Sequence, residues 1–279
     1  MGVDPKSVGA ESAVVKLRYD WTTLVLYALG VGAKREELDY LYEGRGPKVL
    51  PSFGVVPGYA TLGELLGRSG GNLERLVHGA QSVRVHGALP PSGELTTSGV
   101  ITGVYDLKRM TQLVLETRTL LEGRLIFECE WTMIFLGEGG FGGPRPPKSQ
   151  VLKIPSEARP VFSFEETVSP EQALLYRLSG DANPLHADPA FAALVGFEGG
   201  PILHGLATYG FAARALIRGA LGGDGSRVAA FHGQFRKPVW PGETLRTEGF
   251  EVDGKYAMRS FAGGRDEVVA LFSAETLPA

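Results

Sequence analysis

Short apolar runs with polar residues between them recur along most of the chain, and clusters of glycine and proline separate them. This pattern predicts β-strands joined by turns. In the first half we expect strands near residues 82–89, 94–105, 112–120 and 124–136. In the second half we expect strands near residues 161–165, 227–239, 244–252, 255–262 and 266–275. Residues 1–20 are expected to be a partly ordered lead-in.

Helix signals are clearest in the second half. There, a capping residue followed by proline predicts two helix starts and a glycine predicts each stop: Ser169-Pro170 to Gly180, and Asp188-Pro189 to Gly196. A third helix, from residue 205 to about 219, is apolar almost all round, which predicts that it is buried against a sheet. Residues 20–29, ended by Gly30, and residues 61–66 are also expected to be helical.

The composition bounds the class of protein. The 279 residues, 43% of them hydrophobic, are enough for about two domains. The formal charge is −3 and no run of five like charges occurs, so nucleic acid is not an expected partner. The one cysteine, Cys129, excludes an intrachain disulfide and a cysteine zinc site. No apolar segment approaches 18 residues, so we expect no membrane span and a cytoplasmic protein.

Two short stretches indicate a duplicated unit. The sequence PGYATLG at residues 57–63 aligns with HGLATYG at residues 204–210. A run of glycines and prolines at residues 137–147 interrupts the strand pattern between the two halves. We therefore predict three segments: an N-terminal unit over 1–143, a linker over 144–160 and a C-terminal unit over 161–279.

Candidate chemistry is concentrated in the link between the two short helices. Asp181, Asn183 and His186 fall within six positions there, and turn geometry rather than a regular helix face aims their side chains. The third helix begins soon after, at Gly205, whose amide has no intrahelical partner. The sequence thus predicts an acid–base site beside a helix N-terminus. The plainer alternatives are that Asp181 only caps the link and that His186 is a buried packing residue.

A longer set of residues resembles a known family. Three segments carry the resemblance in the second half and two in the first: residues 176–186, 201–205 and 235–242, and residues 76–81 and 137–143. They are similar to the MaoC-like (R)-specific enoyl-CoA hydratase 2 family, which includes the hydratase-2 unit of peroxisomal multifunctional enzyme type 2. The resemblance implies an α+β double hot-dog fold, in which a degenerate N-terminal repeat binds the acyl-CoA and a C-terminal repeat is catalytic. It also implies a homodimer.

The resemblance gives roles to individual residues. It implies a catalytic pair, Asp181 and His186, with Asn183 orienting water and the Gly205 amide on the thioester oxygen. Acyl-CoA contacts are implied for another set: His78, Gly79, Lys108, Pro184, Leu185 and Phe235. The glycine that the family has after the lysine is missing at Lys108. No cofactor is implied, and five histidines without paired spacing predict no metal site.

These features together predict a hydratase that interconverts (2E)-enoyl-CoA and (3R)-3-hydroxyacyl-CoA. One alternative is a dehydratase that takes acyl carrier protein substrates. Another is a non-catalytic acyl-CoA binding module on the same fold, which loss of the acid–base pair would indicate. A thioesterase is disfavoured, because the link supplies a paired aspartate and histidine rather than a lone carboxylate.

Overall fold

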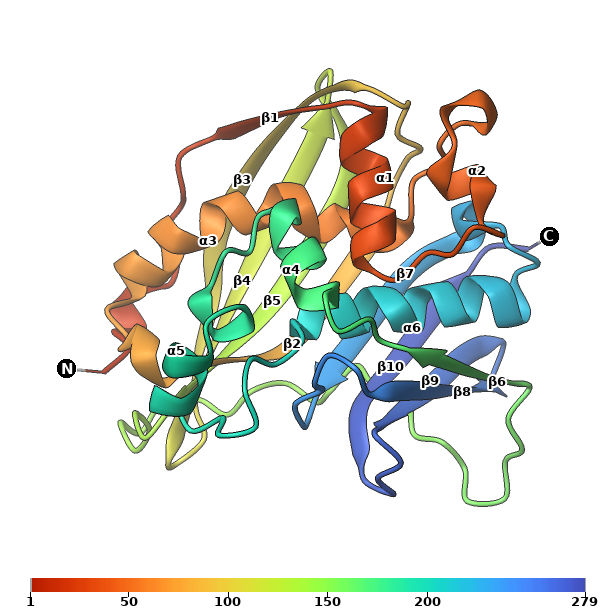
Figure 1. Ribbon diagram of the computed structural model, residues 1–279. Helices are drawn as coiled ribbons and strands as arrows, with labels where there is room; N and C mark the ends of the chain where they lie inside the picture. The colour runs from red at the N-terminus through yellow and green to blue at the C-terminus, as the bar shows by residue number, and fades with distance from the viewer. Residues whose placement is uncertain (1, 279) are drawn as a thin grey trace.

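Ten strands form one antiparallel sheet in the computed structural model, which describes residues 2–278 (Figure 1). In the first half the strands are β1 (Val15–Tyr19), β2 (Leu76–Val85), β3 (Gly93–Asp106), β4 (Met110–Leu121) and β5 (Arg124–Leu136). In the second half they are β6 (Phe162–Thr167), β7 (Val228–Phe235), β8 (Thr244–Val252), β9 (Lys255–Ala262) and β10 (Val268–Thr276).

The strand order divides the sheet into two equivalent halves. From the edge to the centre, the first half runs β1-β3-β4-β5-β2 and the second runs β6-β8-β9-β10-β7. The two central strands pair antiparallel, with Val83 of β2 opposite Phe231 of β7. Equal order in both halves supports the predicted duplication.

The helices lie over one face of this sheet. They are α1 (Trp21–Gly30), α2 (Leu38–Leu41), α3 (Val55–Ser69), α4 (Gln172–Tyr176), α5 (Pro189–Leu194) and α6 (Gly205–Ala220). The two longest, α3 and α6, cross the sheet roughly end to end (Figure 1). Twelve consecutive residues of α6, Leu206 to Ile217, are buried, as its apolar composition predicts. No helix within residues 2–278 has the length and apolarity to cross a bilayer.

One charged side chain is buried in α6. Arg214 is 1% exposed, and its guanidinium binds two carboxylates, Glu37 of the first half and Glu166 of β6. The same guanidinium donates to the carbonyl of Val31 at 3.0 Å. A buried charge of this kind requires paired hydrogen bonds. The ion cluster therefore ties α6 to both halves of the chain.

The structure corrects several sequence-based boundaries. The lead-in contains β1, whose five residues alternate in burial and pair with β3 at an edge of the sheet. The helix expected at Ser169 begins at Gln172, because Ser169 caps a preceding turn and its hydroxyl donates to Glu171. The helix expected at 61–66 extends over all of α3, where Pro57 is tolerated because first-turn amides lack intrahelical partners.

The linker crosses the outer face of the sheet, on the side away from the helices. The amide of Leu152 donates to Ser273 Oγ at 2.7 Å, and Gln150 reaches Glu130 at 3.4 Å. A hollow of about 320 Å³ lies beneath these contacts, and neither Asp181 nor His186 lines it.

Candidate active site

The link between α4 and α5 is shaped by its own turn residues. A 3-10 turn over Arg177–Ser179 follows α4, and Gly180 then takes a φ of +123°, which lets the chain leave that turn sharply. Asn183 then caps a single 3-10 turn over Pro184–His186, with its side chain accepting the amide of Leu185 at 3.0 Å. As a result Asn183 and Pro184 face solvent, Leu185 is half-buried and His186 is directed inward at 8% exposure.

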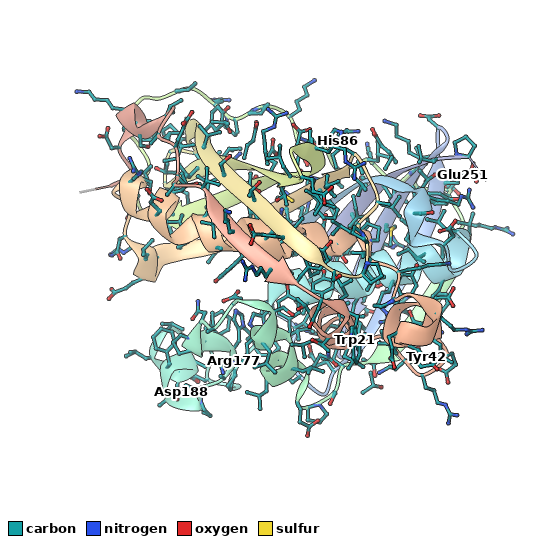
Figure 2. The ribbon with its side chains drawn as sticks, turned by 90° about the horizontal axis from the view of Figure 1, so that it is seen from above. Trp21, Tyr42, His86, Arg177, Asp188 and Glu251 are labelled. Atoms are coloured by element: carbon teal, nitrogen blue, oxygen red, sulfur yellow. The ribbon has the colours of Figure 1, made fainter. Side chains whose placement is uncertain are left out.

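Labelled residues show on which side of the molecule this link lies. Arg177, just before it, and Asp188, which caps α5, lie on the same side as Trp21 of α1 (Figure 2). His86, which follows β2, lies on the opposite side and pairs with Glu128 at 2.7 Å (Figure 2). His86 is therefore remote from the link.

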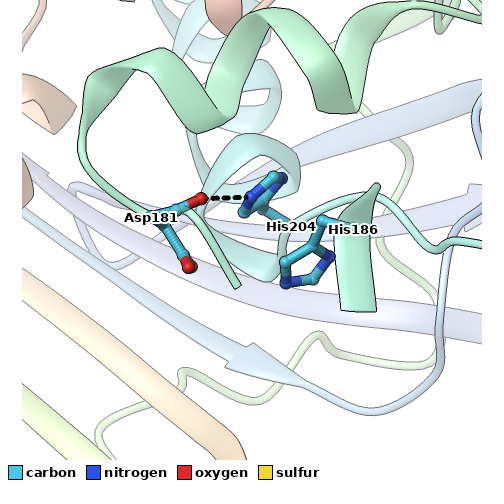
Figure 3. Close-up of side chains that lie close together, drawn as sticks. All are labelled: Asp181, His186 and His204. Atoms are coloured by element: carbon cyan, nitrogen blue, oxygen red, sulfur yellow. Dashed lines mark hydrogen bonds between the residues drawn. The ribbon is translucent and has the colours of Figure 1, made fainter. Parts of the chain in front are cut away.

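Asp181 and His186 converge on one point, and His204 joins them (Figure 3). One side-chain atom from each of the three lies within 4.8 Å of the others. The rings of His186 and His204 stack at a centroid distance of 3.7 Å. His204 also directly precedes α6, so the stack brings the link to the start of that helix.

Hydrogen bonds define which nitrogen of each histidine carries the proton. His186 Nδ1 lies 2.8 Å from the carbonyl of Ile202, so Nδ1 donates and Nε2 holds the lone pair. His204 Nε2 donates to the backbone carbonyl of Asp181 at 3.1 Å (Figure 3). Burial lowers the pKa of His186, against the opposing charge of Asp181. Burial and the neighbouring His186 lower the pKa of His204 to about 3. Both rings are neutral near pH 7.

The Asp181 carboxylate is held on one oxygen only. Its Oδ1 accepts the hydroxyl of Tyr59 at 2.7 Å and the amide of Asn183 at 3.2 Å. Within residues 2–278 no donor contacts Oδ2. Tyr59 belongs to α3 in the first half, so both halves of the chain contribute to the carboxylate's surroundings.

Gly205 begins α6 with a free amide. No acceptor for its N–H is found within residues 2–278. A Cβ built at this position would lie 3.5 Å from three atoms of the Phe235 ring, which is ordinary van der Waals contact. Packing therefore does not require glycine here. The missing side chain leaves a gap about the size of one methyl group between this glycine and Phe235.

His78 also contacts Phe235. Its ring packs edge-on against Phe235 at 5.1 Å and stacks on Trp131 at 5.7 Å. Burial lowers the pKa of His78 to about 4, so the ring is neutral, and its buried Nε2 has no partner within the described residues. The adjacent Gly79 is the extra residue where the β2–β5 register shifts. His78 therefore places one polar nitrogen between the aromatic rings of Phe235 and Trp131.

Lys108 is placed apart from this group. It is exposed in the β3–β4 turn, where Lys108 itself takes the left-handed φ of +67°. The glycine run packs against this turn, and Asp106 accepts the amides of Gly140 and Gly142. Within the described part of the chain, the amide of Lys108 donates to Asp106, and no hydrogen bond or ion pair joins Lys108 to the residues around Asp181.

The three converging side chains are also the single group of potential metal ligands found within residues 2–278. Imidazole lone pairs lie in the ring plane, and these two rings stack with their planes 27° apart. Their lone pairs therefore lie in two nearly parallel planes, with ring centroids 3.7 Å apart, whereas tetrahedral zinc requires ligand lone pairs that meet at one ion. One nitrogen of each ring is also already bound to a carbonyl. The arrangement suits proton transfer better than metal binding.

Two neighbours of the site were not found from the sequence. Tyr59 is 122 residues from Asp181, and no local pattern links them. His204 is not among the predicted site residues, but it both stacks on His186 and binds the Asp181 carbonyl. Its position directly before Gly205 was the only available signal.

Comparison with known proteins identifies the family. Residues 17–137 match the MFE-2 hydratase 2 N-terminal domain, and residues 153–269 match the MaoC like domain. The chain is 36% identical over 282 residues to 3-hydroxyacyl-thioester dehydratase Y of Mycobacterium tuberculosis, an alignment that covers 95% of this chain and 94% of that protein. The chain belongs to the MaoC-like hydratase 2 family.

Other members of the hydratase 2 family agree in sequence and fold. The mouse peroxisomal multifunctional enzyme type 2 is 39% identical over 80% of this chain, which corresponds to 32% of that longer enzyme. The crystal structure of a MaoC-like dehydratase from Phytophthora capsici superposes with a TM-score of 0.88 at 29% identity, covering 99% of this chain and 98% of that one. The predicted α+β double hot-dog fold is confirmed.

Proposed function

We propose that this protein adds water to (2E)-enoyl-CoA and, in reverse, removes it from (3R)-3-hydroxyacyl-CoA, without a metal or redox cofactor. The observation that carries the proposal is the convergence of Asp181 and His186 beside the free amide of Gly205. The names of relatives, among them a probable enoyl-CoA hydratase 2 of Dictyostelium discoideum at 34% identity, support the same reaction.

Each requirement of the reaction has a group of suitable chemistry. Water attacks C3, C2 gains a proton, and the thioester oxygen takes up negative charge. The Gly205 amide, at the positive end of α6, donates to that oxygen. The water lies between Asp181 Oδ2 and the lone pair on His186 Nε2. As its oxygen bonds to C3, His186 accepts one proton, and the pair delivers one proton to C2 on the same face of the alkene.

The substrate residues would surround this centre. The thioester carbonyl approaches the Gly205 amide beside Phe235, and neutral His78 packs against the same ring. Exposed Asn183 and Pro184, with half-buried Leu185, form the outer wall on the link. Lys108 and Gly79 belong to the first repeat, and we assign that repeat, residues 1–143, to acyl-CoA binding and residues 161–279 to catalysis.

Substitution of the two central residues tests this proposal. Asp181→Asn and His186→Gln keep side-chain size, and each should lower kcat about 10²-fold or more with little change in the unfolding midpoint. The assay follows loss of enoyl-thioester absorbance, and Asp188→Asn, which alters only the cap of α5, is the matched control. Near-normal kcat in either site variant removes that residue from the mechanism.

An acyl carrier protein thioester is the second candidate substrate, because the name of one relative specifies only a thioester. Steady-state kinetics with the same acyl group attached to coenzyme A and to acyl carrier protein show which carrier the protein prefers. We expect the higher kcat/KM with coenzyme A.

A further inference from the structure

Tyr59 connects the first repeat to the carboxylate of the site. It lies in the first half of α3, and its hydroxyl donates to Oδ1 of Asp181 at 2.7 Å. The amide of Asn183 donates to the same oxygen at 3.2 Å. Since Oδ2 has no donor within residues 2–278, one oxygen is held by the protein and the other is left open.

The backbone before Tyr59 is fixed by close packing. A Cβ at the preceding residue, Gly58, would lie 2.8 Å from Thr117 Oγ1 and 2.9 Å from Trp131 Cζ2. The Trp131 indole is fully buried and donates to that threonine hydroxyl at 3.1 Å. The helix can approach the sheet this closely only because Gly58 has no side chain. The start of the Tyr59 side chain is therefore held in place.

The Tyr59 hydroxyl stays protonated and can therefore always donate its hydrogen bond to Asp181. Burial, together with the charge of Asp181, raises the pKa of Tyr59, so the phenol stays protonated over the working pH range. An ionised carboxylate only accepts, so the direction of this bond is defined. A hydrogen bond to an ionised partner is also stronger than one between neutral groups.

We propose that Tyr59 is a positioning residue that holds Oδ1 of Asp181, so that Oδ2 faces the water shared with His186. This role rests on the proposed hydratase function. It also gives the first repeat a part in the chemistry beyond acyl-CoA binding. Tyr59 aligns with Leu206 in the PGYATLG and HGLATYG stretches, so the second repeat has no equivalent hydroxyl.

Tyr59→Phe removes the hydroxyl and keeps the ring. The other titratable or charged groups near Asp181 are unchanged in this variant: His78, Tyr176, Arg177, His186 and His204. We expect kcat to fall about tenfold with KM within about threefold, because the carboxylate is less well aligned. The acidic limb of the kcat profile should move to higher pH, because a hydrogen-bond donor to the charged carboxylate is lost.

Tyr40→Phe is the matched control. Its hydroxyl accepts the amide of Gly225 and donates to the carbonyl of Gly223, away from the site. It should lower the unfolding midpoint and leave kcat and the pH profile unchanged. Tyr59→Phe should also add no further loss in an Asp181→Asn background, since the hydroxyl acts through that carboxylate. Wild-type kcat and an unmoved pH limb in Tyr59→Phe, or an undiminished loss in the double variant, would overturn the proposal.

A measurement without substrate separates this role from the hydratase function. With ¹³Cζ-tyrosine, the Tyr59 resonance is assigned by its absence in Tyr59→Phe. It should shift in Asp181→Asn, while the Tyr40 resonance stays in place. If the wild-type protein hydrates no enoyl-CoA, the proposed function fails, and an unmoved Tyr59 resonance would separately refute the contact with Asp181.

Discussion

The substitution Gly205→Ala should have opposite effects on the stability of the protein and on its activity. The added methyl would project onto the face of Phe235 at 3.5 Å, a distance that neither ring nor helix has to yield to accommodate. The residue is not in the left-handed region, so alanine is compatible with the backbone. The protein should therefore fold normally, with a stability change between zero and a gain of about 1 kcal/mol.

The expected effect on catalysis has the opposite sign. The methyl fills the space between the amide of Gly205 and Phe235, through which the thioester oxygen must approach. Loss of one oxyanion donor typically costs about 2.7–4 kcal/mol, or about 10²–10³ in kcat. We expect Gly205→Ala to lose activity by that factor while keeping or gaining stability.

Two other glycines supply controls. A Cβ at Gly67 of α3 meets nothing within 4 Å, so Gly67→Ala should gain about 0.5–1 kcal/mol and keep full activity. A Cβ at Gly210 of α6 would lie 2.3 Å from Val31, so Gly210→Ala should lose stability through a clash. Urea unfolding and initial hydration rates are measured on all three variants. Wild-type kcat in Gly205→Ala, or a loss of kcat matched by a loss of stability, would refute the reasoning.

Two predictions concern buried charge. Arg214→Met removes the buried cation from Glu37 and Glu166 and leaves them only the partly exposed Arg218, which lies 3.7 and 3.4 Å away. We therefore expect a loss of about 3–5 kcal/mol in unfolding free energy by urea titration; a loss below about 1 kcal/mol would show that the cluster is not structural. Because burial lowers the folded-state pKa of His204 to about 3, the unfolded chain binds the proton first, and stability should fall as the pH drops from 6.5 toward 3. His204 contributes at most about 1.4 kcal/mol of unfolding free energy per pH unit. In urea titrations at several pH values, the unfolding free energy of His204→Gln should therefore fall less steeply with decreasing pH than that of wild type. Equal slopes for the two proteins would contradict the prediction.

Regular elements with strong local signals could be predicted from the sequence. The Asp188-Pro189 pair marked the start of α5, and the all-round apolar pattern marked α6 to within a residue or two. These signals succeed because capping and burial depend on neighbours close in sequence. β1 was missed, because its pattern spans only five residues at the sheet edge and is stabilised by pairing with β3, which is remote in sequence.

In the candidate site, too, residues close in sequence could be predicted and residues remote in sequence could not. Asp181, Asn183 and His186 lie in one short link between α4 and α5, so their proximity could be predicted from spacing, although their catalytic roles stay predictions. Tyr59 reaches Asp181 only because the two repeats share one sheet, and no local pattern encodes that contact.

The stereochemical course of hydration tests the central claim most directly. Wild-type protein is supplied with (2E)-enoyl-CoA of short, medium and long chains, and the product is resolved by chiral chromatography. The account predicts loss of the enoyl-thioester absorbance and a 3-hydroxyacyl-CoA of (3R) configuration for at least one chain length. Release of free coenzyme A, a (3S) product, or no reaction with any chain length would contradict it.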